Sequence, residues 1–131
     1  MSFKLTWYGH ATMGMEIDGH TVLVENGAGL GSGIADEEYS RAGAKLVDKV
    51  KKIFSDAHMI LKVKEPLPEE YLLMREGQII FTFFHFAASR ELTDALVRSK
   101  AVAIAYETVR DEKGGHPLLT PMSEVAGRMS I

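Results

Sequence analysis

A run of apolar, aromatic and β-branched residues, IIFTFF, occupies positions 79–84 and leads directly into His85. The run is too short for a membrane-spanning helix, and its composition favours a strand buried on both faces. His85 is therefore expected at or just past the carboxyl end of a central parallel strand, the edge where ligands bind in open α/β sheets. A histidine that is hydrogen-bonded within the core explains the same position equally well.

Strand-like and helical patterns alternate from about residue 20 onward. Candidate strands cover residues 20–25, 45–47, 59–64, 79–84 and 101–105, and the last of these has the composition of a buried strand. Helical patterns begin near Asp36, near Asp48, at residue 68, at Ser89 and at Thr120. This alternation predicts an α/β fold in layers, built on a mostly parallel sheet.

The first 25 residues have a different rhythm. Residues 3–8 alternate between apolar and polar positions, residues 11–17 form a second candidate strand, and Asp18-Gly19 is a hairpin signal that leads into 20–25. These features predict a three-stranded antiparallel β-meander in place of the first strand–helix unit, with its third strand joining the end of the main sheet. The apolar face of the first strand predicts that Trp7 is largely buried.

Length and charge limit the possible partners. At 131 residues the chain has the size of one domain, spanning 1–131. The formal net charge of −3 provides no basic field, so no nucleic-acid partner is predicted.

The absence of cysteine excludes disulfides and zinc–thiolate sites and fits a reducing compartment. The sequence has neither a signal-peptide layout nor the roughly 18 to 20 consecutive apolar residues of a membrane span, so we expect a soluble, cytoplasmic protein with no membrane partner. The last helical pattern reaches residue 131 without a cap or stop signal, and we expect a truncated domain.

A glycine-rich loop, GAGLGSG at 27–33, lies between a strand and a helix, which is the place of a dinucleotide-binding fingerprint. Its glycines alternate with other residues, so the spacing is not GxGxxG, and no acidic residue ends a clear second strand. A flexible turn is the favoured interpretation, and no bound cofactor is predicted. The five histidines also lack the spacing of common metal sites, so no metal is predicted; they are His10, His20, His58, His85 and His116.

Lys62 and Lys64 stand two positions apart near a strand end, so their side chains are expected on one face. A solvated lysine pair is the ordinary interpretation. The functional alternative brings one lysine to His85 and to residues 106–107 at a shared sheet edge. There a lysine could hold a carboxylate, and a histidine could exchange a proton with a carbonyl or hydroxyl group.

Long segments of the chain match a known enzyme family. They are HTVLVE and GAGLGSG from residue 20, MILKVKEPLPEEY at 59–71, FTFFHFAASRELTDAL at 81–96, IAYETV at 104–109 and PLLTPMSEVAGRM at 117–129. With them, residues 20–131 resemble the N-terminal domain of alanine dehydrogenase, the NAD-dependent enzyme that interconverts alanine with pyruvate and ammonia. The resemblance implies a flavodoxin-like α/β domain.

The resemblance also implies roles for two residues. Lys64 resembles the family's lysine that binds the substrate carboxylate, and His85 resembles its catalytic histidine beside the pyruvate carbonyl. The motif with a substrate-binding arginine has no counterpart in residues 1–19. The family's NAD-binding Rossmann domain would lie beyond residue 131, so no nicotinamide is expected next to a substrate. Both residues are therefore expected to be vestigial.

Residues 1–25, which include KLTWYGHA at 4–11, resemble the N-terminal β-strands of metallo-β-lactamase-fold metal-dependent hydrolases. The HxHxDH metal motif of that family is absent, so His10 is not interpreted as a metal ligand. Two families that join near residues 20–25 predict an engineered or recombined chimera.

The chimera is expected to be a folded scaffold without native catalytic activity. The alternative is a substrate-binding fragment of alanine dehydrogenase with weak residual binding of pyruvate or another oxoacid. A monomer or weak homodimer is expected, because a free strand edge and an apolar stripe on the last helix favour some self-association.

Overall fold

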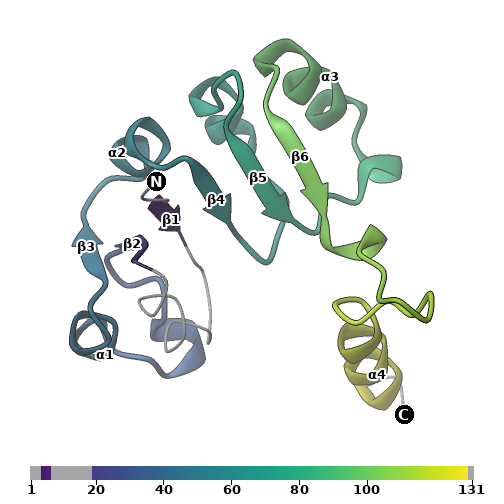
Figure 1. Cartoon of the computed structure of the whole chain (residues 1–131), viewed down its shortest axis with the longest axis horizontal. Helices are drawn as coiled ribbons and strands as arrows, with labels where there is room; N and C mark the ends of the chain where they lie inside the picture. Colours follow the sequence, from purple (N-terminus) through teal and green to yellow (C-terminus); the bar gives the residue numbers. More distant parts are fainter. Residues whose placement is uncertain (1–3, 7–18, 130–131) are drawn as a thin grey trace.

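A six-stranded sheet runs through the molecule (Figure 1). The computed structural model describes residues 4–6 and 19–129. The strand order is β3-β2-β1-β4-β5-β6, and each neighbouring pair is parallel. The α/β fold with a mostly parallel sheet, predicted from the alternating patterns, is confirmed.

The strands and helices are short. The strands are β1 (Lys4–Thr6), β2 (Thr21–Glu25), β3 (Lys45–Val47), β4 (Met59–Leu61), β5 (Ile79–Thr82) and β6 (Val102–Ala105). The α-helices are α1 (Asp36–Arg41), α2 (Val50–Asp56), α3 (Arg90–Ser99) and α4 (Thr120–Met129). Four 3₁₀ helices cover Leu30–Ser32, Pro68–Leu73, Phe86–Ala88 and Tyr106–Thr108.

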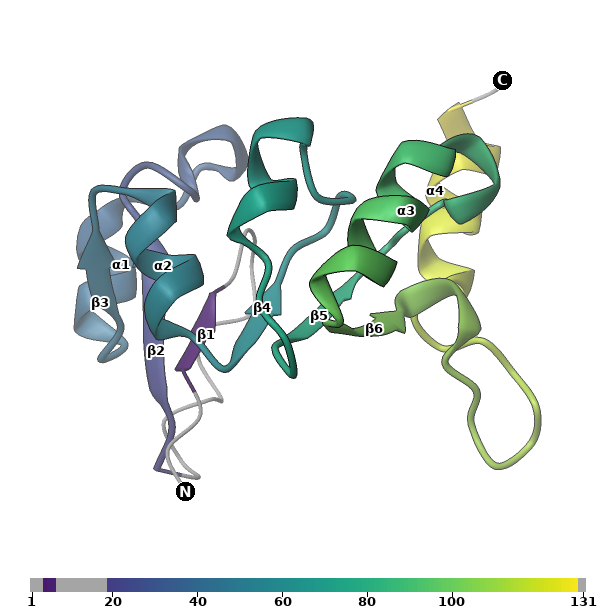
Figure 2. The ribbon, with the colours of Figure 1, turned by 90° about the horizontal axis from the view of Figure 1, so that it is seen from above.

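Alternation along the strands divides the core between the two faces of the sheet. In β2, Leu23 belongs to the larger core with α2 and α3, whereas Val22 and Val24 pack with Tyr39 of α1. Figure 2 shows α2 and α3 on the same side of the strands. Burial on both faces explains why this strand is apolar without interruption, as is typical of parallel sheets.

The central strands follow the same rule. Ile60 of β4 and Ile80 of β5 lie in the larger core, and each is at most 1% exposed. Leu61 and Phe81, one position further along each strand, pack on the opposite face. The run at 79–84 is therefore buried on both faces, as its composition predicts.

Helix α3 begins as the sequence predicts. The Ser89 hydroxyl accepts a hydrogen bond from the Leu92 amide (3.2 Å), so Ser89 is the N-cap. Leu92, Ala95 and Leu96 are buried on the face that meets the sheet. By contrast, Asp48 does not cap α2, because its carboxylate accepts a hydrogen bond from the Asn26 side chain and Lys49 occupies the N-cap position.

The predicted antiparallel meander is wrong in its pairing. Residues 4–6 and 21–23 form a direct parallel ladder, and β1 also pairs with β4 on its other side. An antiparallel meander would place its second strand between these two and its third at the end of the sheet, but β1 fills the central position next to β2. The second candidate strand at 11–17 and Trp7 lie outside the described residues.

The prediction that β6 is a buried strand is also wrong. Val102 and Ile104 are 48% and 36% exposed. The strand lies at the edge of the sheet, and α4 extends beyond it, away from the other strands (Figure 1).

In the described part of the chain, no helix has the combination of length and apolarity needed to cross a membrane.

Candidate functional site

Three loops meet at the carboxyl-end edge of the sheet. They follow β4, β5 and β6, whose directions are the same because the strands are parallel. Backbone hydrogen bonds continue the pairing past the strand ends: Lys62 N donates to Phe81 O (3.2 Å) and Phe83 N donates to Val63 O (3.3 Å). Side chains from distant parts of the sequence therefore converge on one edge, where ligands bind in folds of this class.

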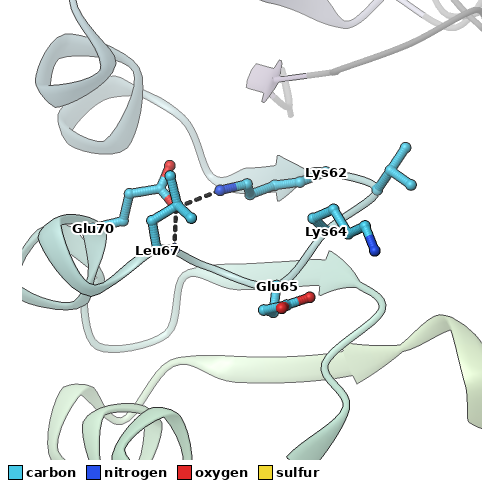
Figure 3. Close-up of a pocket in the computed structure, with 6 residues that line it drawn as sticks. Lys62, Lys64, Glu65, Leu67 and Glu70 are labelled. Carbon is cyan, nitrogen blue, oxygen red and sulfur yellow. Dashed lines mark hydrogen bonds and ion pairs between the residues drawn. The ribbon is translucent and has the colours of Figure 1, made fainter. Parts of the chain in front are cut away.

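Lys62 points into the protein at this edge. Its ammonium group forms an ion pair with Glu70, and the two side chains are 7% and 4% exposed (Figure 3). Glu70 Oε2 also accepts a hydrogen bond from the Leu67 amide (2.7 Å). A buried charge needs such a partner, so Lys62 has a structural role, as the partner of the buried Glu70 carboxylate.

Lys64 is exposed and points away from Glu70, as Figure 3 shows. The two lysines therefore do not share one orientation, because the strand ends at Leu61 and the pleat is not maintained beyond it. Lys64 lines two hollows. One of about 260 Å³ contains Lys62, Val63, Lys64, Glu65, Leu67 and Glu70, and one of about 110 Å³ contains Val63, Lys64, Phe83, His85, Leu119 and Met122.

His85 lies three positions past the end of β5 and is exposed. Its ring stacks on Phe83, with centroids 6.1 Å apart and planes at 27°. It lines the smaller hollow together with Lys64. The structure thus brings together the two residues that the sequence singled out, at the edge where it placed them, and His85 is not a core histidine.

Glu65 lies beside the imidazole, with its Oε2 atom 3.6 Å from His85 Nδ1. This separation is long for a hydrogen bond but suits an ion pair when the ring is protonated. A hydrogen bond from its own backbone amide, followed by the nearby His85 and Lys64 charges, lowers the pKa of Glu65, although burial opposes the shift. The carboxylate form is thereby favoured next to the histidine.

Glu107 reaches the same segment from the loop after β6. Its Oε1 atom accepts hydrogen bonds from the Phe84 amide (3.1 Å) and the His85 amide (3.0 Å), and Oε2 lies 3.4 Å from the Phe84 nitrogen. The expected meeting of His85 with residues 106–107 is therefore present, through the backbone of His85 and not its ring.

Aromatic rings pack together next to this edge of the sheet. Tyr106 packs edge-on against Phe81 (4.3 Å between centroids) and Phe83 (5.0 Å). Burial raises the pKa of the Tyr106 hydroxyl to about 12, so the phenol stays neutral at ordinary pH.

Comparisons with known proteins agree with this geometry. The family model for the alanine dehydrogenase/PNT N-terminal domain matches residues 12–126. The chain belongs to this family. Residues 12–25, expected to be a hydrolase-like segment, thus lie within the dehydrogenase family match.

Individual alanine dehydrogenases are similar over most of the chain. The enzyme of Methanococcus maripaludis is 57% identical over 113 residues and that of Bacillus subtilis 56% over 113, each match covering 86% of this chain. A solved L-alanine dehydrogenase superposes on 92% of this chain with a TM-score of 0.85 and 49% identity. A transhydrogenase from Sinorhizobium meliloti, with a TM-score of 0.73 over 84% of this chain and 24% identity, shares the fold.

The alanine dehydrogenase N-terminal domain is only part of those enzymes. The chain spans 30% and 29% of the two curated relatives and 33% of the solved structure. The comparisons therefore show the family to which this α/β domain belongs.

Several residues at this edge of the sheet were not identified from sequence. They are Glu65, Glu70 and Glu107. For Glu70 a signal exists in retrospect, since it lies three positions after Leu67 at the start of a Pro-led turn, where an acidic side chain caps the backbone. For Glu107 the partners are 22 and 23 positions earlier in the chain, and only the fold brings them close.

The glycine-rich loop of the domain is a closed turn. The Gly27 amide donates to both carboxylate oxygens of Asp36 (2.8 and 3.1 Å), and Gly29 packs against Tyr39.

Among the described residues, no group of three or more potential metal-binding side chains converges. His10 lies outside those residues.

Proposed function

We propose that this chain is the substrate-binding part of an NAD-dependent alanine dehydrogenase, and that it binds pyruvate or a similar small oxoacid weakly through Lys64 and His85. Membership of the alanine dehydrogenase family supports the substrate class. The observation that carries the proposal is the placement of Lys64 and His85 around one hollow at the carboxyl-end edge of the sheet.

The roles of the two side chains follow from their chemistry. The Lys64 ammonium supplies a positive charge for the oxoacid carboxylate, because Lys62 beside it is already paired with Glu70. The His85 imidazole faces the same hollow and can donate a hydrogen bond to the carbonyl oxygen. Val63, Phe83 and Leu119 make most of the remaining wall apolar.

NAD supplies the hydride chemistry of alanine dehydrogenase, but the residues of this chain do not fit it at the glycine-rich loop. The Gly27 amide is already bonded to the Asp36 carboxylate, so a phosphate at this place would meet a negative charge. The proposal is therefore limited to oxoacid binding, and no hydride transfer is assigned to this chain.

A pyruvate titration followed by NMR tests the proposal. We expect the His85 ring resonances to shift with a Kd in the millimolar range, which corresponds to about 4 kcal/mol of standard free energy. Lys64→Gln should weaken binding roughly tenfold or more, because it removes a charged hydrogen-bond donor. Lys113→Gln, at an exposed position in the loop before α4, is the matched control and should leave binding unchanged.

Acetate serves as the ligand control, because it carries the carboxylate without the neighbouring carbonyl. It should shift Lys64 more than His85. If pyruvate at tens of millimolar leaves the His85 resonances in place, the proposal fails, and the alternative of a chimeric scaffold without ligand or activity gains support. That scaffold would also leave unexplained the dehydrogenase match through residues 12–25.

A further inference from the structure

The loop that carries Glu65 is held by three contacts. The Thr82 hydroxyl donates a hydrogen bond to the Lys64 carbonyl (2.7 Å), and Pro66, directly after Glu65, is fully buried. The Leu67 amide donates to a buried carboxylate at 2.7 Å. A residue before proline is also restricted to extended backbone geometry. The backbone of Glu65 is therefore fixed by the fold, and its carboxylate has a defined place at this edge of the sheet.

One oxygen atom of Glu65 lacks a hydrogen-bond donor. Its Oε2 atom is buried and accepts no hydrogen bond from the described residues. His85 Nδ1 lies 3.6 Å away, and a movement of about half an ångström would bring the two atoms within hydrogen-bond range. The two side chains are 57% and 43% exposed, so this movement is open to them. Buried polar atoms are nearly always hydrogen-bonded, and an N–H group at Nδ1 would satisfy this oxygen.

The contact distinguishes the two nitrogen atoms of the His85 ring. A neutral imidazole carries its proton on Nδ1 or on Nε2, and the hydrogen bond made by one nitrogen decides which. A carboxylate beside Nδ1 favours the proton there, as it does in Ser-His-Asp triads. The lowered pKa of Glu65 keeps this carboxylate ionised. Nε2 is then the nitrogen left for the hollow, which is lined by His85 but not by Glu65.

We propose that Glu65 is a positioning residue for His85: its carboxylate holds the ring proton on Nδ1 and leaves Nε2 as the nitrogen that faces a bound oxoacid. In this arrangement the neutral ring presents a lone pair to the oxoacid carbonyl, and only the protonated ring can donate to it. Pyruvate binding therefore takes up one proton from solvent at Nε2. The tautomer stands on the contacts alone, and the consequence for oxoacid binding rests on the proposed function above.

The other charged groups at the ring come from two loops. Lys64 lines the hollow together with His85, and the Glu107 carboxylate is bonded to the His85 amide. The segment at the start of α4 contributes only the apolar side chains of Leu119 and Met122 to the hollow. Because these groups stay the same in every variant below, comparison with the parent protein isolates the effect of Glu65.

Nitrogen-15 NMR of the imidazole in the full chain tests the tautomer, at a pH where the ring is neutral by its own proton shifts. We expect the Nδ1–H form to dominate in the parent. In Glu65→Ala the ratio of Nδ1–H to Nε2–H should fall roughly tenfold or more, because a charged acceptor is lost. Glu69→Ala removes an exposed carboxylate four positions later and is the charge-matched control, with no change expected.

Glu65→Gln covers the case in which the alanine variant does not fold. Glutamine keeps the size of the side chain and an oxygen that can accept from Nδ1, but it has no charge. The tautomer ratio should therefore lie between those of the parent and Glu65→Ala.

Pyruvate titrations at several pH values test the consequence for binding. Above the midpoint of the ring titration, the affinity of the parent should fall about tenfold per pH unit, the slope for uptake of one proton. In Glu65→Ala the neutral ring can adopt the Nε2–H form and donate without taking up a proton, so the affinity should fall much less steeply. A residue that only braces the loop would change the affinity by the same factor at every pH.

An Nε2–H ring in the parent, or an equal tautomer ratio in the parent and Glu65→Ala, would overturn the proposal. Parallel pH slopes in the two proteins would overturn its consequence for binding. If the tautomer changes as expected but pyruvate shifts no resonance, Glu65 positions the ring and the proposed function fails. If pyruvate binds while the parent ring is Nε2–H, the proposed function stands without Glu65.

Discussion

The Lys62 ammonium and the Glu70 carboxylate form an ion pair that is almost completely removed from solvent. Glu70 also accepts a hydrogen bond from the Leu67 amide. The same carboxylate therefore links Lys62, just after β4, to the start of the 3₁₀ helix Pro68–Leu73. The pair occupies a wall of the larger hollow next to Lys64. It therefore fixes the loop on which the proposed oxoacid-binding lysine stands.

Lys62→Met should destabilise the protein by about 3 to 5 kcal/mol, because it leaves the Glu70 charge buried without its partner. Lys62→Met combined with Glu70→Gln should cost less than the single change, since the neutral amide can still accept the Leu67 N–H. Urea denaturation measures both.

The control is the exposed pair Lys52–Asp56, whose side chains are 65% and 31% exposed. Lys52→Met should change the free energy of unfolding by at most about 0.5 kcal/mol. A Lys62→Met variant as stable as this control would show that the buried pair contributes little.

Thr82→Val tests the link between β5 and the lysine loop. The Thr82 hydroxyl donates to the Lys64 carbonyl at 2.7 Å, and valine keeps the shape but leaves that carbonyl without its partner. We expect a loss of about 1 to 3 kcal/mol in urea denaturation, with faster hydrogen exchange at the Lys64 loop. Thr108→Val removes an exposed hydroxyl bonded to the Ala105 carbonyl and should cost less than Thr82→Val.

Gly29→Ala should destabilise the protein by about 1 to 3 kcal/mol, as overpacking does. A Cβ atom at this position would lie 2.6 Å from the Tyr39 ring and 2.7 Å from the Ile34 carbonyl oxygen. Gly31→Ala in the same loop has nothing within 4 Å and is the matched control. Thermal melts of the two variants should differ clearly, and equal melting temperatures would contradict the packing of Tyr39 under this loop.

Tyr106 should make the protein less stable as the pH rises. Burial raises its pKa from 10.0 to about 12, so the folded state holds the proton more tightly than the unfolded state. The contribution is complete below pH 10 and is lost between about pH 10 and 12, to a total of about 2 to 3 kcal/mol.

The measurement is urea unfolding over this pH range for the parent protein and Tyr106→Phe. Phenylalanine cannot ionise, so the stability of the variant should fall less steeply. Tyr39, whose pKa is also raised by burial and by Asp36 and Glu38, contributes to both proteins and cancels in the comparison. Parallel stability curves would contradict a buried, neutral Tyr106.

The sequence predicted most elements of this fold because each depends on local chemistry. The apolar run at 79–84 is buried on both faces, with Ile80 and Phe84 on one side and Phe81 and Phe83 on the other. Ser89 caps α3 through the contact expected of a serine before a helix. The edge location of Lys64 and His85 followed from the strands that precede them.

The errors concern relationships between distant segments. The pattern of residues 4–6 indicates a strand but does not specify its neighbours, and so did not exclude a meander. Residues 102–105 have the composition of a buried strand, yet the edge position leaves Val102 exposed. Glu107 gave no local signal, since its hydrogen bonds are to amides that only the folded sheet brings within reach.

The central position of β1 has a consequence for the cooperativity of unfolding. Leu5 pairs with Val22, 17 positions further along the chain, and with Met59, 54 positions further along. Closing the longer loop costs only about 1 kcal/mol more in chain entropy, because this cost grows with the logarithm of length. Strand β1 therefore joins two parts of the sheet, β2 with β3 and β4 to β6, which have no other shared ladder among the described strands. Because Leu23 and Val47 of one part also share a core with Ile60 and Ile80 of the other, we expect unfolding to lose its cooperativity if β1 cannot dock between them.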